Sequence, residues 1–421
     1  MNAVVSLVRE LVVVRSTVAW HGHVSRDPFA RLQLAEGRRD PYPLYEEVRR
    51  RGPLIPTPLV GFQTASHRIC REVLRDRGFG VQSEESLRPA DGGLSLLELD
   101  PPDHTRLRRL VAPSFTPRAL AGARARIESV VDELLGDLPP DAPFDLVTGL
   151  ASPLPIRVIT DLLGVPDDDS AAFARDGATI GSALAGVQSV GHVVRLIEAN
   201  RRLAALMEQV FEDHRRAPRD DLVSRLLAAE GQQARADELA PLCRLLLVAG
   251  FETTVNLIGN TVLALLEHPD QWQEVVDDPS LAAAAVEETL RWDPPVQRTF
   301  RAPLADVELA GVAIPRGAML MLLLAGANRD PEVFEHPDRF DLHRYDGHRP
   351  PEAEHLSFSA GIHYCIGAPL ARLEATVAVE QLARRYPKLQ RAGRLRRRGG
   401  GTVIRGPAEF VVGQPSGVLA A

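Results

Sequence analysis

The chain has 421 residues, of which 45% are hydrophobic and 25% charged, and its formal net charge is −7. This balance is typical of a globular protein, excludes a disordered or fibrous chain, and gives no basic field that favours nucleic acid. Three widely spaced cysteines, at 70, 243 and 365, indicate a reducing compartment rather than a disulfide framework. We therefore expect a soluble, cytoplasmic protein with a core large enough to enclose a cofactor.

The N-terminal segment 4–19 is rich in valine and leucine, but Arg9, Glu10 and Arg15 interrupt it. It is too short and too charged for a membrane helix, which needs ~20 apolar residues. It also lacks the ordered regions of a signal peptide. We predict an additional surface helix or strand and no membrane span, with a peripheral contact or a misassigned start codon as the alternatives.

Helical periodicity dominates the rest of the chain, and strand-like runs are few and short. The stretch 331–364 is aperiodic and rich in Pro, Asp and His, and loops of this length tend to be functional. The arginines and glycines of 394–401 are expected to form an exposed loop or turn. We predict helices near 42–48, 117–136, 151–164, 190–215 and 236–267, and strands near 308–314, 318–324 and 402–412.

A first candidate site lies at 100–108. Asp100 followed by Pro101 predicts a helix start, with the aspartate as the cap and the proline at the first position. His104 and Arg108 then share one face of that helix. Without other information, both are more often surface charges.

The long helix at 236–267 carries an unusual centre, from Ala249 to Thr254. Gly250 and the paired threonines are poor helix formers, and a threonine hydroxyl can bond back to the carbonyl one turn earlier and bend the helix. Glu252 beside Thr253 in an apolar helix makes a short proton relay. The plainer interpretation is a solvent-facing Glu-Thr step.

Two further motifs follow. Glu288 and Arg291 lie three apart on a helix, a spacing that alone indicates no more than a surface ion pair. Cys365 stands in the loop 358–367, just before a helical stretch whose N-terminus can stabilise a thiolate. Gly361 and Gly367 allow the backbone to turn and to approach a flat cofactor. A zinc site is disfavoured because no second Cys or His has ligand spacing.

These segments together resemble the cytochrome P450 family. The loop 358–367 matches the family's Phe-x-x-Gly-x-His/Arg-x-Cys-x-Gly signature. The helix centre matches Ala/Gly-Gly-x-Asp/Glu-Thr, and 288–291 matches Glu-x-x-Arg, whose partner is the arginine of a Pro-x-Arg-Phe segment, here 337–340. The departures are Ser359, where glycine is usual, and Phe251, where histidine is frequent.

The resemblance implies a mainly α fold with small β-sheets, as one domain at 39–421 behind an extension of unknown role at 1–38. A haem b (iron protoporphyrin IX) is expected between the central helix and the cysteine-loop helix. The resemblance assigns the residues as follows: Cys365 as the iron ligand; His104, Arg108, Arg301 and His363, with Arg298 as a weaker substitute for Arg301, as propionate contacts; Ala249, Phe358, Gly361 and Gly367 as further haem contacts; Glu252 and Thr253 as catalytic; Glu288, Arg291 and Arg339 as a buried structural triad; and Val248, Val296 and Ile404 as pocket residues.

The implied function is a haem-thiolate monooxygenase that inserts one oxygen atom from O2 into an apolar small molecule, by hydroxylation or epoxidation, in secondary metabolism. Electrons are expected from NAD(P)H through a ferredoxin and its reductase, received near Arg106, Arg109 and Arg372. The alternatives are a haem-thiolate peroxygenase or oxidative coupling enzyme, and a non-catalytic helper of the same fold. Glu252 with Thr253 argues against a peroxygenase, and Cys365 argues against a helper.

Overall fold

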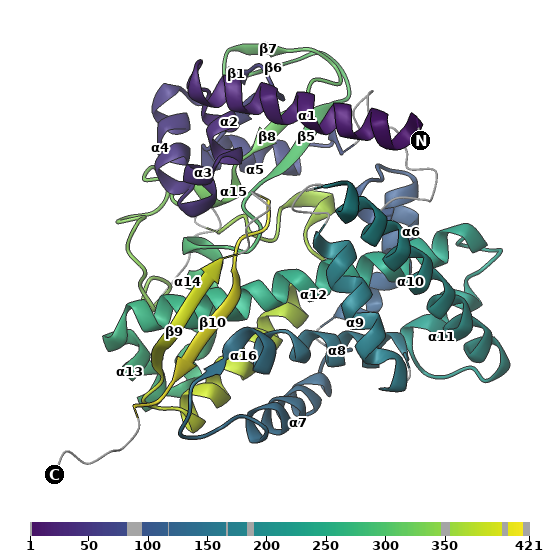
Figure 1. The fold of residues 1–421 in the computed structure, drawn as a ribbon. Coiled ribbons are helices and arrows are strands. Elements are labelled where there is room, and N and C mark those ends of the chain that lie inside the picture. Colours follow the sequence, from purple (N-terminus) through teal and green to yellow (C-terminus); the bar gives the residue numbers. More distant parts are fainter. Residues whose placement is uncertain are drawn as a thin grey trace.

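The fold is built around one long buried helix, as Figure 1 shows. The computed structural model describes residues 2–81, 95–116, 118–165, 167–182, 189–346, 354–397 and 403–415. Helix α12 (Ala236–Glu267) is apolar on almost every side and packs against α8, α9, α14 and α16. Among the described helices it alone is long and apolar enough to cross a membrane, yet most of that apolar stretch is buried, as in a core helix of a globular protein.

Helices make up most of the molecule, and amphipathic faces turn their apolar sides toward α12 and its neighbours. The helices besides α12 are α1 (Asn2–His23), α2 (Pro28–Gln33), α3 (Ala35–Arg39), α4 (Tyr42–Arg51), α5 (His67–Arg75), α6 (Asp103–Val111), α7 (Ala123–Gly136), α8 (Pro153–Leu163), α9 (Asp167–Gly181), α10 (Val190–Arg216), α11 (Leu222–Ala228), α13 (Pro269–Asp277), α14 (Ala282–Trp292), α15 (Leu324–Ala327) and α16 (Ala368–Arg385).

The strands form three small sheets at the edge of the helical body. The largest has the order β1-β2-β8-β5-β3, the second β4-β10-β9, and the third is the hairpin β6-β7. Their bounds are β1 (Ile55–Thr57), β2 (Gly61–Thr64), β3 (Phe79–Gly80), β4 (Phe144–Asp145), β5 (Thr299–Pro303), β6 (Val307–Leu309), β7 (Val312–Ile314), β8 (Leu320–Leu322), β9 (Gln390–Arg397) and β10 (Pro407–Gly413). The mainly helical fold with small sheets agrees with the prediction.

The N-terminal segment forms helix α1, which packs on α2 and leaves Val13, Val14 and Trp20 exposed. The next helix is not a surface addition. Phe29 and Leu32 of α2 are buried in one cluster with residues of α4. The core therefore continues across residue 38, where the extension was predicted to end.

Three local expectations need correction. Helix α7 begins at Ala123 rather than near 117. The run 308–314 is not one strand but a hairpin, turned at Ala310 and Gly311, both with positive φ. Residues up to Arg397 belong to strand β9 and not to a loop, because they pair with β10 while their arginine side chains remain exposed. Charges of this kind are common on edge strands, where they discourage further pairing.

Candidate active site

Cys365 lies at the N-terminal end of α16. Its backbone N–H donates to the carbonyl of Phe358 at 2.8 Å and closes the loop between them. The backbone amides of Gly367 and Ala368 lie near the sulfur and lower the pKa of its thiol. Burial raises the pKa of the Cys365 thiol, whereas these amides and the nearby Arg108 guanidinium favour the thiolate. A metal cation that binds this sulfur would displace the thiol proton and stabilise the thiolate.

The loop glycines have different roles. Gly361 has φ +67°, and a Cβ there would lie 2.3 Å from the carbonyl oxygen of Leu74. Its lack of a side chain therefore allows close packing against the end of α5. A Cβ at Gly367 would meet nothing within 4 Å, so open space lies beside the cysteine. Ser359 adopts φ +63°, a conformation that favours the glycine usual at this position.

Two histidines from separate segments meet beside this loop. The ring centroids of His104 in α6 and His363 in η7 (Gly361–His363) are 4.2 Å apart. Both ring nitrogens of His104, and Nε2 of His363, have no hydrogen-bond partner among the described residues. Burial, together with nearby positive groups, lowers the pKa of His363 to about 3. Buried polar nitrogens without partners require an explanation, and a bound acceptor provides one.

Two arginines complete the cluster. Arg108 donates to the carbonyl of Tyr364 at 2.6 Å, and Arg301 lies buried close enough to depress the pKa of His363. Burial lowers the pKa of Arg301 to about 10. The carboxylate of Asp100 lies 3.9 Å from His363, beyond hydrogen-bond distance. Two arginines thus face one carboxylate in the described part of this pocket, and its positive charge is not fully balanced. The two propionates of a haem would balance it.

Two expectations about this region change. Arg298, the weaker candidate for the same role, lies elsewhere, stacked 5.1 Å from the ring centroid of Phe29. Asp100 does not cap α6. The helix begins at Asp103, and the Asp100 side chain instead accepts from the backbone N–H of Val81 at 3.0 Å. The Asp100 carboxylate therefore binds the backbone just after β3, and not the N-terminus of α6.

The centre of α12 carries the predicted back-bonds. The hydroxyl of Thr253 donates to the carbonyl of Ala249 at 2.6 Å, and that of Thr254 to Gly250 at 2.8 Å. Glu252 is 2% exposed, so it is not part of a solvent-facing step. The helix nevertheless continues unbroken from Ala236 to Glu267.

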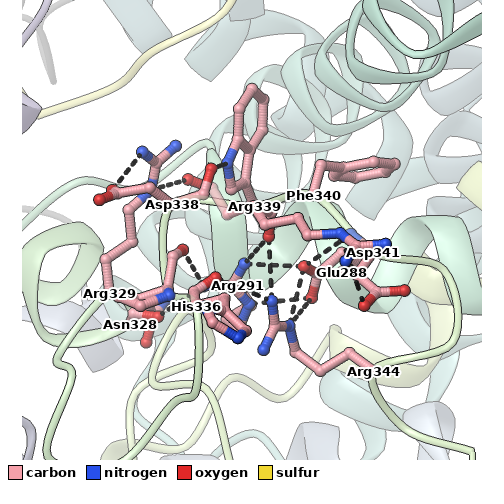
Figure 2. Close-up of polar contacts among 12 residues, drawn as sticks. Glu288, Arg291, Asn328, Arg329, His336, Asp338, Arg339, Phe340, Asp341 and Arg344 are labelled. Carbon is pink, nitrogen blue, oxygen red and sulfur yellow. Dashed lines mark hydrogen bonds and ion pairs between the residues drawn. The ribbon is translucent and has the colours of Figure 1, made fainter.

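A buried ion network lies at the end of α14, drawn in Figure 2. Glu288 and Arg291 are both fully buried and joined by two hydrogen bonds, at 2.7 and 2.9 Å. The third member is not Arg339, whose side chain is 68% exposed and which contributes only its carbonyl. Arg344 takes that place, with Nε 3.0 Å from a Glu288 oxygen. The prediction of Arg339 was wrong because its side chain lies at the surface beside the buried Phe340, whereas Arg344 reaches Glu288 from the following turn, where its backbone N–H bonds to Asp341.

The three predicted pocket residues are apolar and mostly buried. Val296 and Ile404 pair in an isolated β-bridge, which joins the chain after α14 to the chain before β10. Val248 is 1% exposed on α12, one residue before Ala249. The structure therefore brings two of the three residues together.

Comparison with known proteins identifies the family. The family model "Cytochrome P450" matches residues 190–389. Cytochrome P450 monooxygenase PikC of Streptomyces venezuelae is 41% identical over 83% of this chain and 85% of its own. Vitamin D(3) 25-hydroxylase of Pseudonocardia autotrophica is 43% identical, with 71% of each chain covered. The ligand-free crystal structure of CYP164A2 of Mycobacterium smegmatis superimposes with a TM-score of 0.83 and 38% identity, covering 91% of this chain and 99% of the other.

The chain therefore belongs to the cytochrome P450 family and is a haem-dependent monooxygenase.

Proposed function

We propose that Cys365 would bind the iron of a haem through its thiolate and that His104, Arg108, Arg301 and His363 would hold the propionates. The haem, when bound, supplies the iron at which O2 is activated. One observation supports this assignment above the others. A cluster of cationic groups with too little anionic charge lies beside a cysteine at a helix N-terminus. Ala249, Phe358, Gly361 and Gly367 are proposed to line the same cofactor.

We infer that Glu252 and Thr253 deliver protons during oxygen activation. Glu252 is buried, and the Thr253 hydroxyl is held by its bond to the carbonyl of Ala249. A proton donor held in one position gives general acid assistance typically worth about 10²–10⁴-fold. This pair also supports monooxygenation over the peroxygenase or coupling alternative.

The proposed substrate is an apolar small molecule of secondary metabolism, hydroxylated or epoxidised next to Val248, Val296 and Ile404. Apolar side chains exclude water and bind by shape, which suits a C–H or C=C target with few polar groups. Related proteins act on or hold such compounds. One is named a vitamin D(3) 25-hydroxylase, and crystal structures of CYP109E1, 32% identical, contain corticosterone or testosterone.

We propose that electrons come from NAD(P)H through a ferredoxin and its reductase, which are cytoplasmic in bacteria. The sequence pointed to Arg106, Arg109 and Arg372 as the docking residues. Arg106 is bound to Glu238, and Arg372 to Glu287. A better docking feature is a hollow of about 290 Å³ beside the cysteine loop, lined by Arg71 and Arg75 of α5.

Arg71 and Arg75 share one face of α5, and neither has an ion-pair partner in the part of the chain that the structure describes. Unpaired arginines at the edge of a hollow attract carboxylates. Acidic side chains of a ferredoxin would therefore bind within reach of the proximal side of the haem. Arg109 of α6 is also exposed and stays a candidate docking residue.

The test of the proposed function is spectroscopic. The purified protein, reduced and treated with carbon monoxide, should show the absorption band of thiolate-ligated haem, and Cys365→Ala should lose it. A band that survives in Cys365→Ala would refute the ligand assignment. Vitamin D3, testosterone and myristic acid are then screened for the spectral change that accompanies displacement of the distal water. If none of a broad apolar set produces it, the proposed substrate class is wrong.

A further inference from the structure

Helix α9 crosses α12 at the proposed proton donor. A Cβ built on Gly181, the last residue of α9, would lie 2.5 Å from Oε2 of Glu252 and 3.6 Å from its Cδ. Real Cβ atoms essentially never approach another heavy atom so closely. The carboxylate of Glu252 therefore lies against the backbone of Gly181, in the space that a side chain at 181 would fill.

A second glycine of α9 provides a comparison. Gly177 lies one turn earlier on the same face, and a Cβ there would lie 3.1 Å from Cδ2 of Leu247. Both glycines allow α9 and α12 to approach closely. Of these two glycines, only Gly181 contacts an ionisable group, so its role extends beyond helix packing.

The end of α9 is itself fixed. The Ser182 hydroxyl donates to the carbonyl of Thr179 and lies 2.8 Å from Nε2 of His192, near the start of α10. The backbone on which the carboxylate rests is thus connected to two helices. Glu252 has three side-chain torsions, and the missing side chain at Gly181 leaves open the rotamer in which Oε2 lies against the backbone of α9.

We propose that Gly181 is a positioning residue for proton delivery, because its missing side chain lets the Glu252 carboxylate occupy one place beside Thr253. This inference rests on the proposed function of Glu252. A methyl group at 181 would push Oε2 away by roughly 1 Å to restore ordinary contact, and a misplacement of about 1 Å can cost on the order of 10²-fold in rate.

The experiment compares Gly181→Ala with Gly177→Ala as the matched control. Alanine favours helix, so both variants should fold and bind haem. Carbon monoxide is the probe, because the infrared C–O stretch of its complex responds to nearby polar groups. Gly181→Ala should shift this band, and Gly177→Ala should leave it unchanged. Glu252→Asp, whose side chain is one methylene shorter, should restore the band when combined with Gly181→Ala.

A second measurement follows the fate of the electrons from NADPH rather than the position of the carboxylate. With a plant-type ferredoxin, its reductase and a substrate found by the spectral screen, hydrogen peroxide formed per NADPH should rise about threefold in Gly181→Ala, because weaker acid assistance diverts the electron pair from product to peroxide. Gly177→Ala should match the parent. Equal behaviour of the two alanine variants, or no restoration by Glu252→Asp, overturns the role of Gly181.

Glu252→Gln separates the two proposals. If Glu252→Gln raises peroxide but Gly181→Ala does not, only the positioning role fails. If Glu252→Gln itself leaves peroxide unchanged, the proton-delivery function fails and the inference fails with it.

Discussion

At the scale of single residues, the ion network of Glu288 shows what a motif identifies and what it leaves open. Burial of Glu288 with Arg291 follows from their spacing and the family pattern. The third member does not, because Arg339 and Arg344 both lie in an aperiodic segment whose path depends on tertiary contacts. In the structure, Arg344 reaches Glu288, while the side chain of Arg339 lies exposed.

This correction gives a paired prediction. Arg344→Ala should lower the free energy of unfolding by about 3–5 kcal/mol, because it leaves a buried carboxylate with one of its two charged partners missing. Arg339→Ala should change it by less than about 0.5 kcal/mol, since that side chain is exposed. Urea denaturation monitored by circular dichroism measures both. If both variants lost the same free energy of unfolding, Arg344 would not be the third member in place of Arg339.

Thr253 carries the second prediction at this scale. Thr253→Ala should bind haem and substrate as the parent does, because the hydrogen bond that its hydroxyl donates is to the Ala249 carbonyl of its own helix. Product formed per NAD(P)H should fall at least about tenfold, with hydrogen peroxide released instead, because the acid assistance is lost. Product and peroxide are measured together with a substrate found by the screen. Unchanged coupling would make Thr253 a helix-bending threonine only.

At the scale of elements, long periodic segments were predictable and short ones were not. The bounds of α12 agree with the prediction because apolar residues recur along the whole helix and polar residues stand at both ends. β9 was missed because four arginines among eight residues look like a solvated loop, and only pairing with β10 makes them a strand. The site shows the same contrast. His104 and Arg108 lie beside the cysteine loop as the resemblance implied, whereas Arg339 does not join its network and the Gly181 contact lacks any local sequence signal.

The N-terminal helices give the third prediction. Removal of residues 1–24 should change stability by less than about 1 kcal/mol, because the described apolar side chains of α1 are largely exposed. Removal of 1–38 should cost on the order of 3–6 kcal/mol, because Phe29 and Leu32 would leave the core, at about 1.5–3 kcal/mol each. Thermal unfolding of the two truncations compares them. Equal stability of both would support an independent extension that ends at residue 38.

At the scale of the whole molecule, the chain is acidic, with a net charge of −7, yet the hollow beside the cysteine loop presents unpaired arginines. An acidic partner would be repelled by the molecule at large and attracted at one place. Such a distribution selects orientation as well as partner. Sequence charge alone could not reveal it, because pairing with Glu238 and Glu287 neutralises arginines that look equivalent in the sequence.

The fourth prediction follows from this distribution. Reduction by a ferredoxin should slow as salt rises from 0.05 to 1 M, since the Debye length falls to about 3 Å at 1 M. Arg71→Glu with Arg75→Glu should slow it roughly tenfold at low salt, because attraction becomes repulsion. Arg216→Glu, an exposed change at the end of α10, serves as the control. If the stopped-flow reduction rate changes neither with salt nor in the double variant, the docking surface lies elsewhere.

The cysteines described above also determine how this protein reacts with thiol reagents. Cys70 and Cys243 are fully buried, and burial raises the pKa of the Cys243 thiol to about 12 and that of Cys70 further. Cys365 is the partly exposed one. A maleimide should therefore label one thiol per chain in protein without haem and three in unfolded protein. Protein loaded with haem should give none, so the label counts empty active sites in any preparation.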